Sequence, residues 1–486
     1  MITFAISIVL LVVGYFFYGK LIERIFGANP ERETPAYSKQ DGVDYIPMKS
    51  WRSFMIQFLN IAGLGPIFGA IMGAKFGTSS FLWIVFGSIF AGAVHDYISG
   101  MLSLRMDGAG LPEIHGKFLG NRVKRLMRFF TVVLLILVGA VFISGPAEIL
   151  ATLTPETFNM TFWIVVILIY YIIATLLPID KLIGKVYPLF GFCLLFMAVG
   201  IMVELFYHHP QLPEIWQGLD NKQHNAANNP IFPMMFVSIA CGAISGFHAT
   251  QSPLMARCLT NERQGRPIFY GAMILEGVVA LIWAAAASYL FYTPEGQALV
   301  PAGQSMTPAA IVNLLCNHWL GVVGAVLAIL GVVAAPISTG DTAFRSARLV
   351  VADALNINQR TLLKRLGVAV PLFVAGFIVL LYSLWDKEGF AVIWNGFSWA
   401  NQFLAMVTLW AVTVYLSVEK KCYWVTLIPA LFMTMVSISF ILVSKTTGFG
   451  LPYRWGYIAA AIMTLSFMVW FFVWRKRKNK LSITHK

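Results

Sequence analysis

Four titratable side chains lie within long apolar segments, where an ionised group is costly. His95 and Asp96 are adjacent, His248 belongs to a polar stretch, and Glu276 lies within a later apolar run. Ionisable residues inside membrane-spanning segments are rare and usually mark ion or substrate pathways. A histidine changes charge near neutral pH, and a buried carboxylate needs a partner. We therefore predict that these residues couple or gate transport, with Glu276 the first candidate for carrying a proton and His248 the second.

Two of these side chains have alternative interpretations. Asp96 alternatively belongs to an inner gate, where a basic residue such as Arg105 would pair with it. His248 either relays a proton or, as an imidazolium, holds a carboxylate. The polar residues around it alternatively form a hydrogen-bonded cluster between helices.

Two polar, glycine-rich breaks interrupt apolar segments. The first is Asn60-Ile-Ala-Gly-Leu-Gly-Pro66, and the second runs from Cys241 to Pro253. Backbone groups freed by such breaks cannot face lipid, so the breaks must line a cavity or be buried in protein. Paired interruptions in the two halves of a chain indicate a transporter's binding site. The predicted substrate-binding residues are Asn60, Gly63, Gly65, Ser245, Gly246, His248, Gln251 and Asn401.

The first break also has the pattern of a close helix contact. Gly65, Gly69, Gly73 and Gly77 recur every four residues, which allows two helices to approach closely. We expect both packing and function here. The amide end of the helix after Pro66 would attract an anion, and the open carbonyls would attract a cation.

Composition excludes several classes of protein. The chain has 486 residues, of which 58% are apolar and 12% charged, as in a polytopic membrane protein. The net charge of +13 lies mainly in loops, so we expect no nucleic-acid partner. The five cysteines have no metal-ligand or paired spacing and are interpreted as small core residues. We find no phosphate loop, nucleophile triad or metal-ligand cluster, and therefore predict neither an enzyme nor a cofactor.

Apolar runs of about 20 residues predict an all-α protein with about thirteen transmembrane helices. The first run is predicted to be a retained span, because no basic region or cleavage site marks a signal peptide. The predicted spans are 2–19, 53–75, 80–104, 128–150, 160–178, 187–206, 233–256, 268–292, 319–343, 363–385, 392–417, 423–444 and 453–474.

The basic residues alternate with these spans. Of the 35 Lys and Arg residues, all but about five fall in loops on one side or in the tail. Cytoplasmic loops carry the excess of Lys and Arg. We therefore predict a multi-pass membrane protein with an external N-terminus and a cytoplasmic C-terminus.

The breaks divide the spans into two blocks of five. Because five is odd, the second block enters the membrane from the opposite side, which gives an inverted repeat with two discontinuous helices. The predicted parts of this single transporter domain are an N-terminal helix and loop (1–52), the first repeat (53–206), the second repeat (233–417), two C-terminal helices (423–474) and a basic tail (475–486).

Five motifs in order resemble those of the carbon starvation protein A family. They are residues 60–66, Val94-His-Asp-Tyr97, Ser245-Gly-Phe-His248, Tyr270-Gly-Ala-Met-Ile-Leu-Glu276 and Trp399-Ala-Asn-Gln402. That family is similar to transporters of the amino acid–polyamine–organocation superfamily, which have the five-plus-five inverted repeat. The resemblance implies uptake of pyruvate or peptides in bacteria, and therefore a position in the bacterial inner membrane.

The resemblance also suggests a cation site. In sodium-coupled relatives of this fold, two neighbouring hydroxyls complete a sodium site with carbonyls of the first broken helix. Ser338 and Thr339 match that pattern, with the backbone of Ala62 and Gly65 opposite, and oxygen ligands suit a hard cation. The alternative is a helix that ends at Pro336 and polar residues that cap the next segment.

Together these observations predict a secondary transporter that imports a small carboxylate, with pyruvate as the first candidate, by symport with a proton or a sodium ion. A peptide transporter of the carbon-starvation response is the close alternative, and a membrane nutrient receptor that does not transport is another. The expected partners are the small-molecule substrate and the lipid bilayer.

Overall fold

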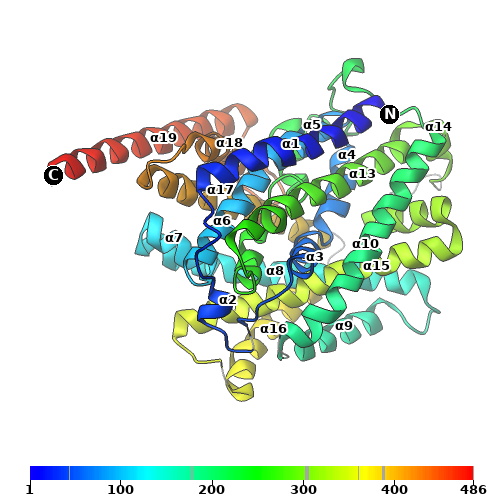
Figure 1. Ribbon diagram of the computed structural model, residues 1–486. Coiled ribbons are helices and arrows are strands. Elements are labelled where there is room, and N and C mark those ends of the chain that lie inside the picture. Colours follow the sequence, from blue (N-terminus) through cyan, green and yellow to red (C-terminus); the bar gives the residue numbers. More distant parts are fainter. Residues whose placement is uncertain (43, 177–178, 301–305, 360, 386–388, 485–486) are drawn as a thin grey trace.

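A computed structural model shows how the helices are arranged (Figure 1). The residues that it describes form helices and loops, with no strand among them. The structure describes residues 1–486 apart from 43, 177–178, 301–305, 360, 386–388 and 485–486.

The helices fall into two blocks with flanking elements. The first block contains α3 (Ser50–Ile61), η1 (Gly65–Gly69), α4 (Ala70–Ala74), α5 (Ser79–Gly87), η2 (Ser88–Gly92), α6 (Ala93–Arg105), α8 (Asn121–Leu153), α9 (Met160–Leu176) and α10 (Ile179–His208). The second contains η4 (Ile231–Met235), α11 (Phe236–Ser238), α12 (Gly246–Ala256), η6 (Arg266–Gly271), α13 (Ala272–Tyr292), α15 (Pro308–Leu355), α16 (Leu362–Trp385) and α17 (Gly389–Val418). The other helices are α1 (Ile2–Phe26), α2 (Pro35–Ser38), α7 (Leu111–Leu119), η3 (Ile215–Gln217), η5 (Glu262–Gln264), α14 (Pro294–Ala298), α18 (Trp424–Val443) and α19 (Tyr453–Thr484).

Both predicted helix breaks are present, but the second has different bounds from those predicted. α3 ends at Ile61, and the chain resumes as η1 and α4 after a bend of 52°. In the second block α11 ends at Ser238 and α12 begins at Gly246, so the break covers residues 239–245. The prediction that it extends to Pro253 is wrong, because residues 246–253 belong to α12. Each block therefore opens with a discontinuous helix.

Each predicted span coincides with a helix or with an interrupted helical segment. Within the described part of the chain, however, nine helices are long and apolar enough to cross a membrane, or ten if the bent pair is one span. The predicted all-α fold with many apolar helices is confirmed, whereas the number of thirteen crossings stays a prediction.

Helices at equivalent places in the two blocks make equivalent contacts. α8 of the first block packs against α15 of the second. α10 contacts α15 and α3, and its counterpart α17 contacts α8 and α12. The contact of α10 with α15 thus has its equivalent in the contact of α17 with α8. Such equivalent contacts agree with the five-plus-five repeat expected from the spans.

The helix that carries Ser338 and Thr339 does not end at Pro336. α15 continues to Leu355 with Pro336 inside it, so the interpretation of these hydroxyls as caps of a new segment is wrong. Neighbouring helices can compensate for the hydrogen bond that an internal proline removes. The interruption of α15 lies instead at Gly321, whose φ of 62° and ψ of −175° are not helical.

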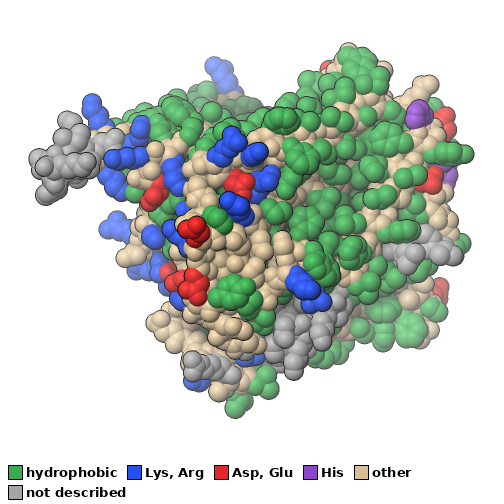
Figure 2. Space-filling view, in the orientation of Figure 1, with side chains coloured by type: hydrophobic (Ala, Val, Ile, Leu, Met, Phe, Trp, Pro, Cys, Tyr) green, Lys and Arg blue, Asp and Glu red, His purple; other side chains and the backbone are tan. Residues whose placement is uncertain are grey.

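Basic side chains gather on one side of the face seen in Figure 2. They lie toward the end of the molecule where α19 terminates, while hydrophobic side chains dominate toward the N-terminus. The two termini lie at opposite ends of the view (Figure 1). The asymmetry follows the pattern that cytoplasmic loops produce, and the orientation of the termini stays a prediction.

Candidate functional site

The two helix breaks touch each other. A side-chain carbon added to Gly65 would lie 2.2 Å from Cβ of Cys241, and Gly242, with a φ of 88°, lies close to Pro66. Similarly, a carbon added to Gly69 would lie 2.9 Å from the carbonyl oxygen of Ser238. The glycines thus allow the first broken helix to cross the second at its break, which confirms the packing interpretation for Gly65, Gly69 and Gly73. For Gly77 it is wrong, because this residue follows α4 in a turn with a φ of 85° and lies against Asp220 and Lys222.

A buried chain of titratable groups begins on α6. Asp96 accepts through Oδ1 from Nδ1 of His95 at 2.7 Å and through Oδ2 from Nδ1 of His248 at 2.8 Å. All three side chains are fully buried. One carboxylate therefore orients two imidazole rings from α6 and α12.

Glu276 of α13 extends this chain. Nε2 of His248 lies 3.3 Å from Oε2 of Glu276, and the glutamate is fully buried. Because Asp96 fixes the other ring nitrogen of His248, Nε2 is aimed at Glu276. We call His95, Asp96, His248 and Glu276 the charge relay; the structure thus brings together all four predicted coupling residues.

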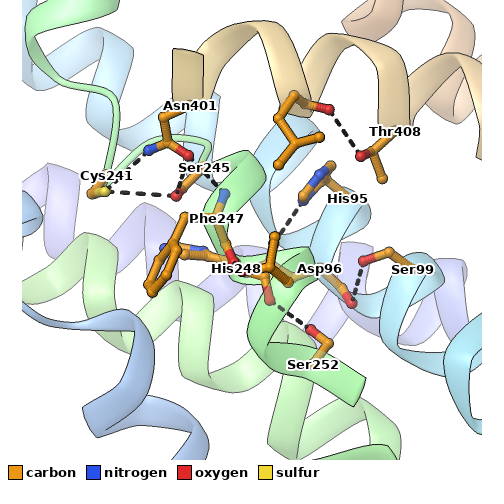
Figure 3. Close-up of polar contacts among 12 residues, drawn as sticks. His95, Asp96, Ser99, Cys241, Ser245, Phe247, His248, Ser252, Asn401 and Thr408 are labelled. Carbon is orange, nitrogen blue, oxygen red and sulfur yellow. Dashed lines mark hydrogen bonds and ion pairs between the residues drawn. The ribbon is translucent and has the colours of Figure 1, made fainter. Parts of the chain in front are cut away.

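Asn401 closes the second break from α17 (Figure 3). Its Oδ1 accepts from the backbone N–H of Phe247 at 2.6 Å and from the hydroxyl of Ser245 at 3.1 Å. Its Nδ2 donates to Sγ of Cys241 at 3.4 Å. Asn401 therefore caps the first turn of α12. It occupies the backbone N–H of Phe247, which could otherwise bind a substrate anion.

The remaining predicted substrate contacts differ in what surrounds them. Asn60 is fully buried, and neither its Oδ1 nor its Nδ2 has a hydrogen-bond partner. Gln251 donates to the hydroxyl of Thr250 at 3.0 Å, away from the charge relay. Gly246 packs against the backbone of α17, and Gly63 packs against Phe142. Among the predicted contacts that the structure describes, Asn60 therefore has an entire amide free to bind a ligand, and His248 has its Nε2 without a hydrogen-bond partner.

Gln57 extends the unpartnered surface of α3. It is fully buried, and both its amide oxygen and its amide nitrogen lack a partner. Gln57 and Asn60 are three residues apart and therefore share one face of the helix. Unsatisfied buried polar groups are costly, so this pair suits a polar ligand.

The predicted cation site is only partly assembled. Thr339 donates to the carbonyl of Leu59 at 3.1 Å, and its hydroxyl oxygen would lie 3.0 Å from a side chain at Gly63. Ser338 donates to Ala335 of its own helix at 2.7 Å. The structure therefore brings Thr339, rather than Ser338, to the first broken helix, one turn before Ala62.

Arg105 does not pair with Asp96, so the inner-gate interpretation with this pair is wrong. Arg105 donates to Glu262 through Nε at 2.9 Å and through Nη2 at 2.8 Å, and also to the carbonyl of Gly27. The backbone N–H of Asn29 donates to the same glutamate. This ion pair fastens the segment after α1 to α6 and η5.

Replacing Arg105 with Gln is expected to lower the stability of the folded protein by about 3 kcal/mol, because Glu262 would remain buried without its main partner. Arg32→Gln is the matched control: Arg32 is half exposed and lies 3.7 Å from the same carboxylate, a geometry worth about 0–1 kcal/mol. Thermal unfolding in detergent measures both variants, and equal midpoints would contradict the expectation.

A family model identifies the chain. The model described as carbon starvation protein CstA matches residues 1–157, 149–319 and 295–440. The chain belongs to the carbon starvation protein CstA family. Relatives of this CstA-family chain include an uncharacterized membrane protein of Haemophilus influenzae, 44% identical over 63% of this chain and 96% of the relative.

Two further relatives have functional names. A peptide transporter CstA of Campylobacter jejuni is 26% identical over 89% of this chain and 78% of its own length. The pyruvate/proton symporter BtsT of Escherichia coli is 27% identical, over 58% of this chain and 48% of its own length. This CstA-family chain is accordingly a multi-pass inner-membrane transporter and not an enzyme.

Solved structures share the fold of the CstA-family chain. The crystal structure of a single-residue mutant of the Eremococcus coleocola manganese transporter superposes with a TM-score of 0.56 at 13% identity, over 88% of this chain and 94% of that one. At this identity the likeness concerns the fold alone.

In the CstA-family chain, Cys241 joins the site although its sequence spacing indicated only a core residue. Among the described residues, Cys241, His248 and Glu276 form a group whose ligand atoms lie within 4.8 Å of one another. Such donors can hold a divalent cation. However, His248 already contacts Asp96 and Glu276 directly, so a relay of side chains explains these contacts without an ion.

Proposed function

We propose that this chain imports a small carboxylate, with pyruvate as the first candidate, by symport with a proton. The observation that carries the proposal is the charge relay, which connects α6, α12 and α13 beside the crossing of the two breaks. Two of its contacts are hydrogen bonds of 2.7 and 2.8 Å. The third is the ion-pair distance of 3.3 Å between His248 and Glu276, whose facing atoms form no hydrogen bond, so a small movement of Glu276 would complete a path for a proton. Coupling by Glu276 and His248 is thereby supported by geometry as well as by residue type.

A proton suits a carboxylate substrate for electrostatic reasons. Pyruvate carries one negative charge, so importing it with one proton moves no net charge against the membrane potential, which costs about 2.3 kcal/mol per charge and 100 mV. The substrate would bind at the first break, where Asn60 and Gln57 offer side-chain amides without partners. The backbone at Gly63 and Gly65 would become accessible to it only after the two broken helices separate at their crossing. Rocking of one helix group against the other would provide alternating access.

A sodium ion is the second candidate for coupling. Thr339 reaches the carbonyl of Leu59 in the first broken helix, and hydroxyl and carbonyl oxygens suit a hard cation. Ser338 and the carbonyls of Ala62 and Gly65 would have to move toward Thr339 to complete this site. The charge relay has its members already in contact, which favours the proton.

The names of the relatives leave two substrate classes in view. One relative is named a pyruvate/proton symporter and another a peptide transporter. The direction of import would be set by an inward proton gradient, which drives the coupled substrate in the same direction. A receptor that binds without transport is the remaining alternative, which accumulation inside vesicles distinguishes.

Purified protein in proteoliposomes tests the proposal. Labelled pyruvate is expected to accumulate when the outside is acidic, and a sodium gradient alone is expected to give no accumulation. A labelled dipeptide measured in parallel serves as the control for substrate class. Accumulation of the dipeptide alone would replace the carboxylate by a peptide, sodium-driven accumulation would replace the proton, and saturable binding without accumulation would overturn the transport reaction.

A further inference from the structure

A cavity of about 430 Å³ lies at the predicted external ends of both broken helices. Met72 and Lys75 border it from the end of the first broken helix, and Val237 and Ser238 border it from the helix just before the second break. Asn395 of α17 and Lys445, which follows α18, complete its polar wall. Its size is within the range of small-molecule sites.

The charges around this cavity have one sign. Lys75 and Lys445 are exposed at its edge, and its described lining contains no Asp or Glu. The other polar lining groups are neutral amides and hydroxyls, such as Asn228, whose Oδ1 accepts from Nζ of Lys445 at 3.1 Å. A concave surface with cations and no anions focuses a positive potential.

This concentration of charge is unusual for its side of the molecule. The predicted external loops hold only about five of the 35 basic residues, and two of those five, Lys75 and Lys445, border the same cavity. The general excess of Lys and Arg in cytoplasmic loops explains basic residues on that side of the membrane, but it does not explain these two lysines. Lys75 also lies 5.7 Å above the ring of Phe291, but this contact does not explain why both lysines border one cavity, whereas an anionic ligand would.

Contacts between the two broken helices lie between the cavity and the first break. Gly73 packs against Ile239, and Gly69 packs against the carbonyl of Ser238. Gly65 lies ten residues before Lys75, which corresponds to about 15 Å of helix. A substrate moving from the cavity to the first break would therefore have to pass two successive turns of glycine contacts.

We propose that this cavity is an external entry site for small carboxylates, in which Lys75 and Lys445 select the negative charge before the substrate reaches the breaks. The inference rests on the proposed carboxylate transport and on the external position of this end. The inference adds a second binding site on the path of the substrate and names the two residues that set the charge preference of that site. The neutral amides around the lysines carry no negative charge, so they leave the positive charge of the cavity uncompensated, and their N–H groups would donate to the carboxylate.

A measurement that needs no transport tests the charge of the cavity. Asn395→Cys places a thiol in its wall, and a negatively and a positively charged methanethiosulfonate reagent are added from outside. After correction for their rates with a free thiol, the anionic reagent is expected to react about tenfold faster than the cationic one. Adding Lys75→Gln and Lys445→Gln is expected to abolish this preference, whereas adding Arg454→Gln is expected to leave it. Equal corrected rates, or a preference that survives loss of both lysines, would overturn the inference.

Uptake kinetics test the same lysines in the transporter. In Lys75→Gln/Lys445→Gln the apparent KM for pyruvate is expected to rise about tenfold at low ionic strength with an unchanged maximal rate, and the difference should shrink at high salt. Lys75→Arg/Lys445→Arg should retain the low KM. An unchanged KM in the double Gln variant refutes the entry site while pyruvate transport stands. If the wild-type protein does not transport pyruvate, the proposed function fails, and the thiol measurement still decides the charge selectivity of the cavity.

Discussion

Replacing Glu276 with Gln is expected to abolish accumulation of pyruvate under an imposed pH gradient. Glutamine has nearly the same shape as glutamate but cannot bind and release the coupling proton. Asp96 would still hold His248 through Nδ1, so the substrate-binding region should keep its structure. Exchange of labelled for unlabelled pyruvate, with no gradient imposed, is therefore expected to continue. The two assays, performed on the same proteoliposomes, separate coupling from binding.

Glu113→Gln is the matched control for this experiment. Burial raises the pKa of Glu113, but hydrogen bonds with Lys124 and Arg128 outweigh that effect and leave its pKa below the usual value. Glu113 therefore stays ionised near neutral pH and offers no exchangeable proton. Its substitution is expected to leave accumulation unchanged. Undiminished accumulation in Glu276→Gln would remove Glu276 from the mechanism.

The features that the sequence predicts well are local in the chain. About 20 apolar residues suffice to mark a span, and Gly63, Gly65 and Pro66 mark a break where helix formation is costly. The structure has helices at the predicted spans and breaks at both predicted positions. The pairing of the breaks followed from their matching positions in the two blocks.

The partners of charged groups could not be predicted in this way. Asp96 contacts His248, which lies 152 residues further along the chain, and Arg105 contacts Glu262, which lies 157 residues away. Charge type alone allowed Asp96 to pair with the nearby Arg105. The packing of α6 against α12 brings His248, and not Arg105, to Asp96. This packing joins segments that are far apart in the chain, so the local sequence does not reveal it.

For some residues of the site the sequence contains only a weak signal of their position. Gln57 precedes Asn60 by three residues, and helical spacing places both on one face. The capping role of Asn401 had no such local signal, because α17 and α12 are far apart in the chain. Lys75 and Lys445 were visible as exceptions to the charge asymmetry, but their common cavity depends on the fold.

Gly65→Ala is expected to damage both folding and transport through the crossing of the breaks. The added carbon would lie 2.2 Å from Cβ and 2.4 Å from Sγ of Cys241, closer than real side-chain atoms approach. Overpacking a core of this kind costs about 1–3 kcal/mol, and here it would also separate the two broken helices. We expect a lower midpoint of thermal unfolding in detergent and a fall of about tenfold or more in the initial rate of pyruvate uptake.

A second substitution identifies the cause of that damage. Cys241→Gly removes both clashing atoms, and the nearest remaining atom of that residue, its Cα, would lie 3.6 Å from the new carbon, which is an ordinary contact. Gly65→Ala/Cys241→Gly should therefore recover stability and uptake beyond Gly65→Ala alone. Gly367→Ala controls for the general effect of adding a methyl group, because nothing lies within 4 Å of that position. Cys241→Gly alone controls for loss of the contact between Sγ of Cys241 and Asn401. If that variant is stable and active and the double variant still fails to recover, Gly65 is required for its backbone freedom, so that movement of the break, rather than its close packing on Cys241, limits the transport cycle.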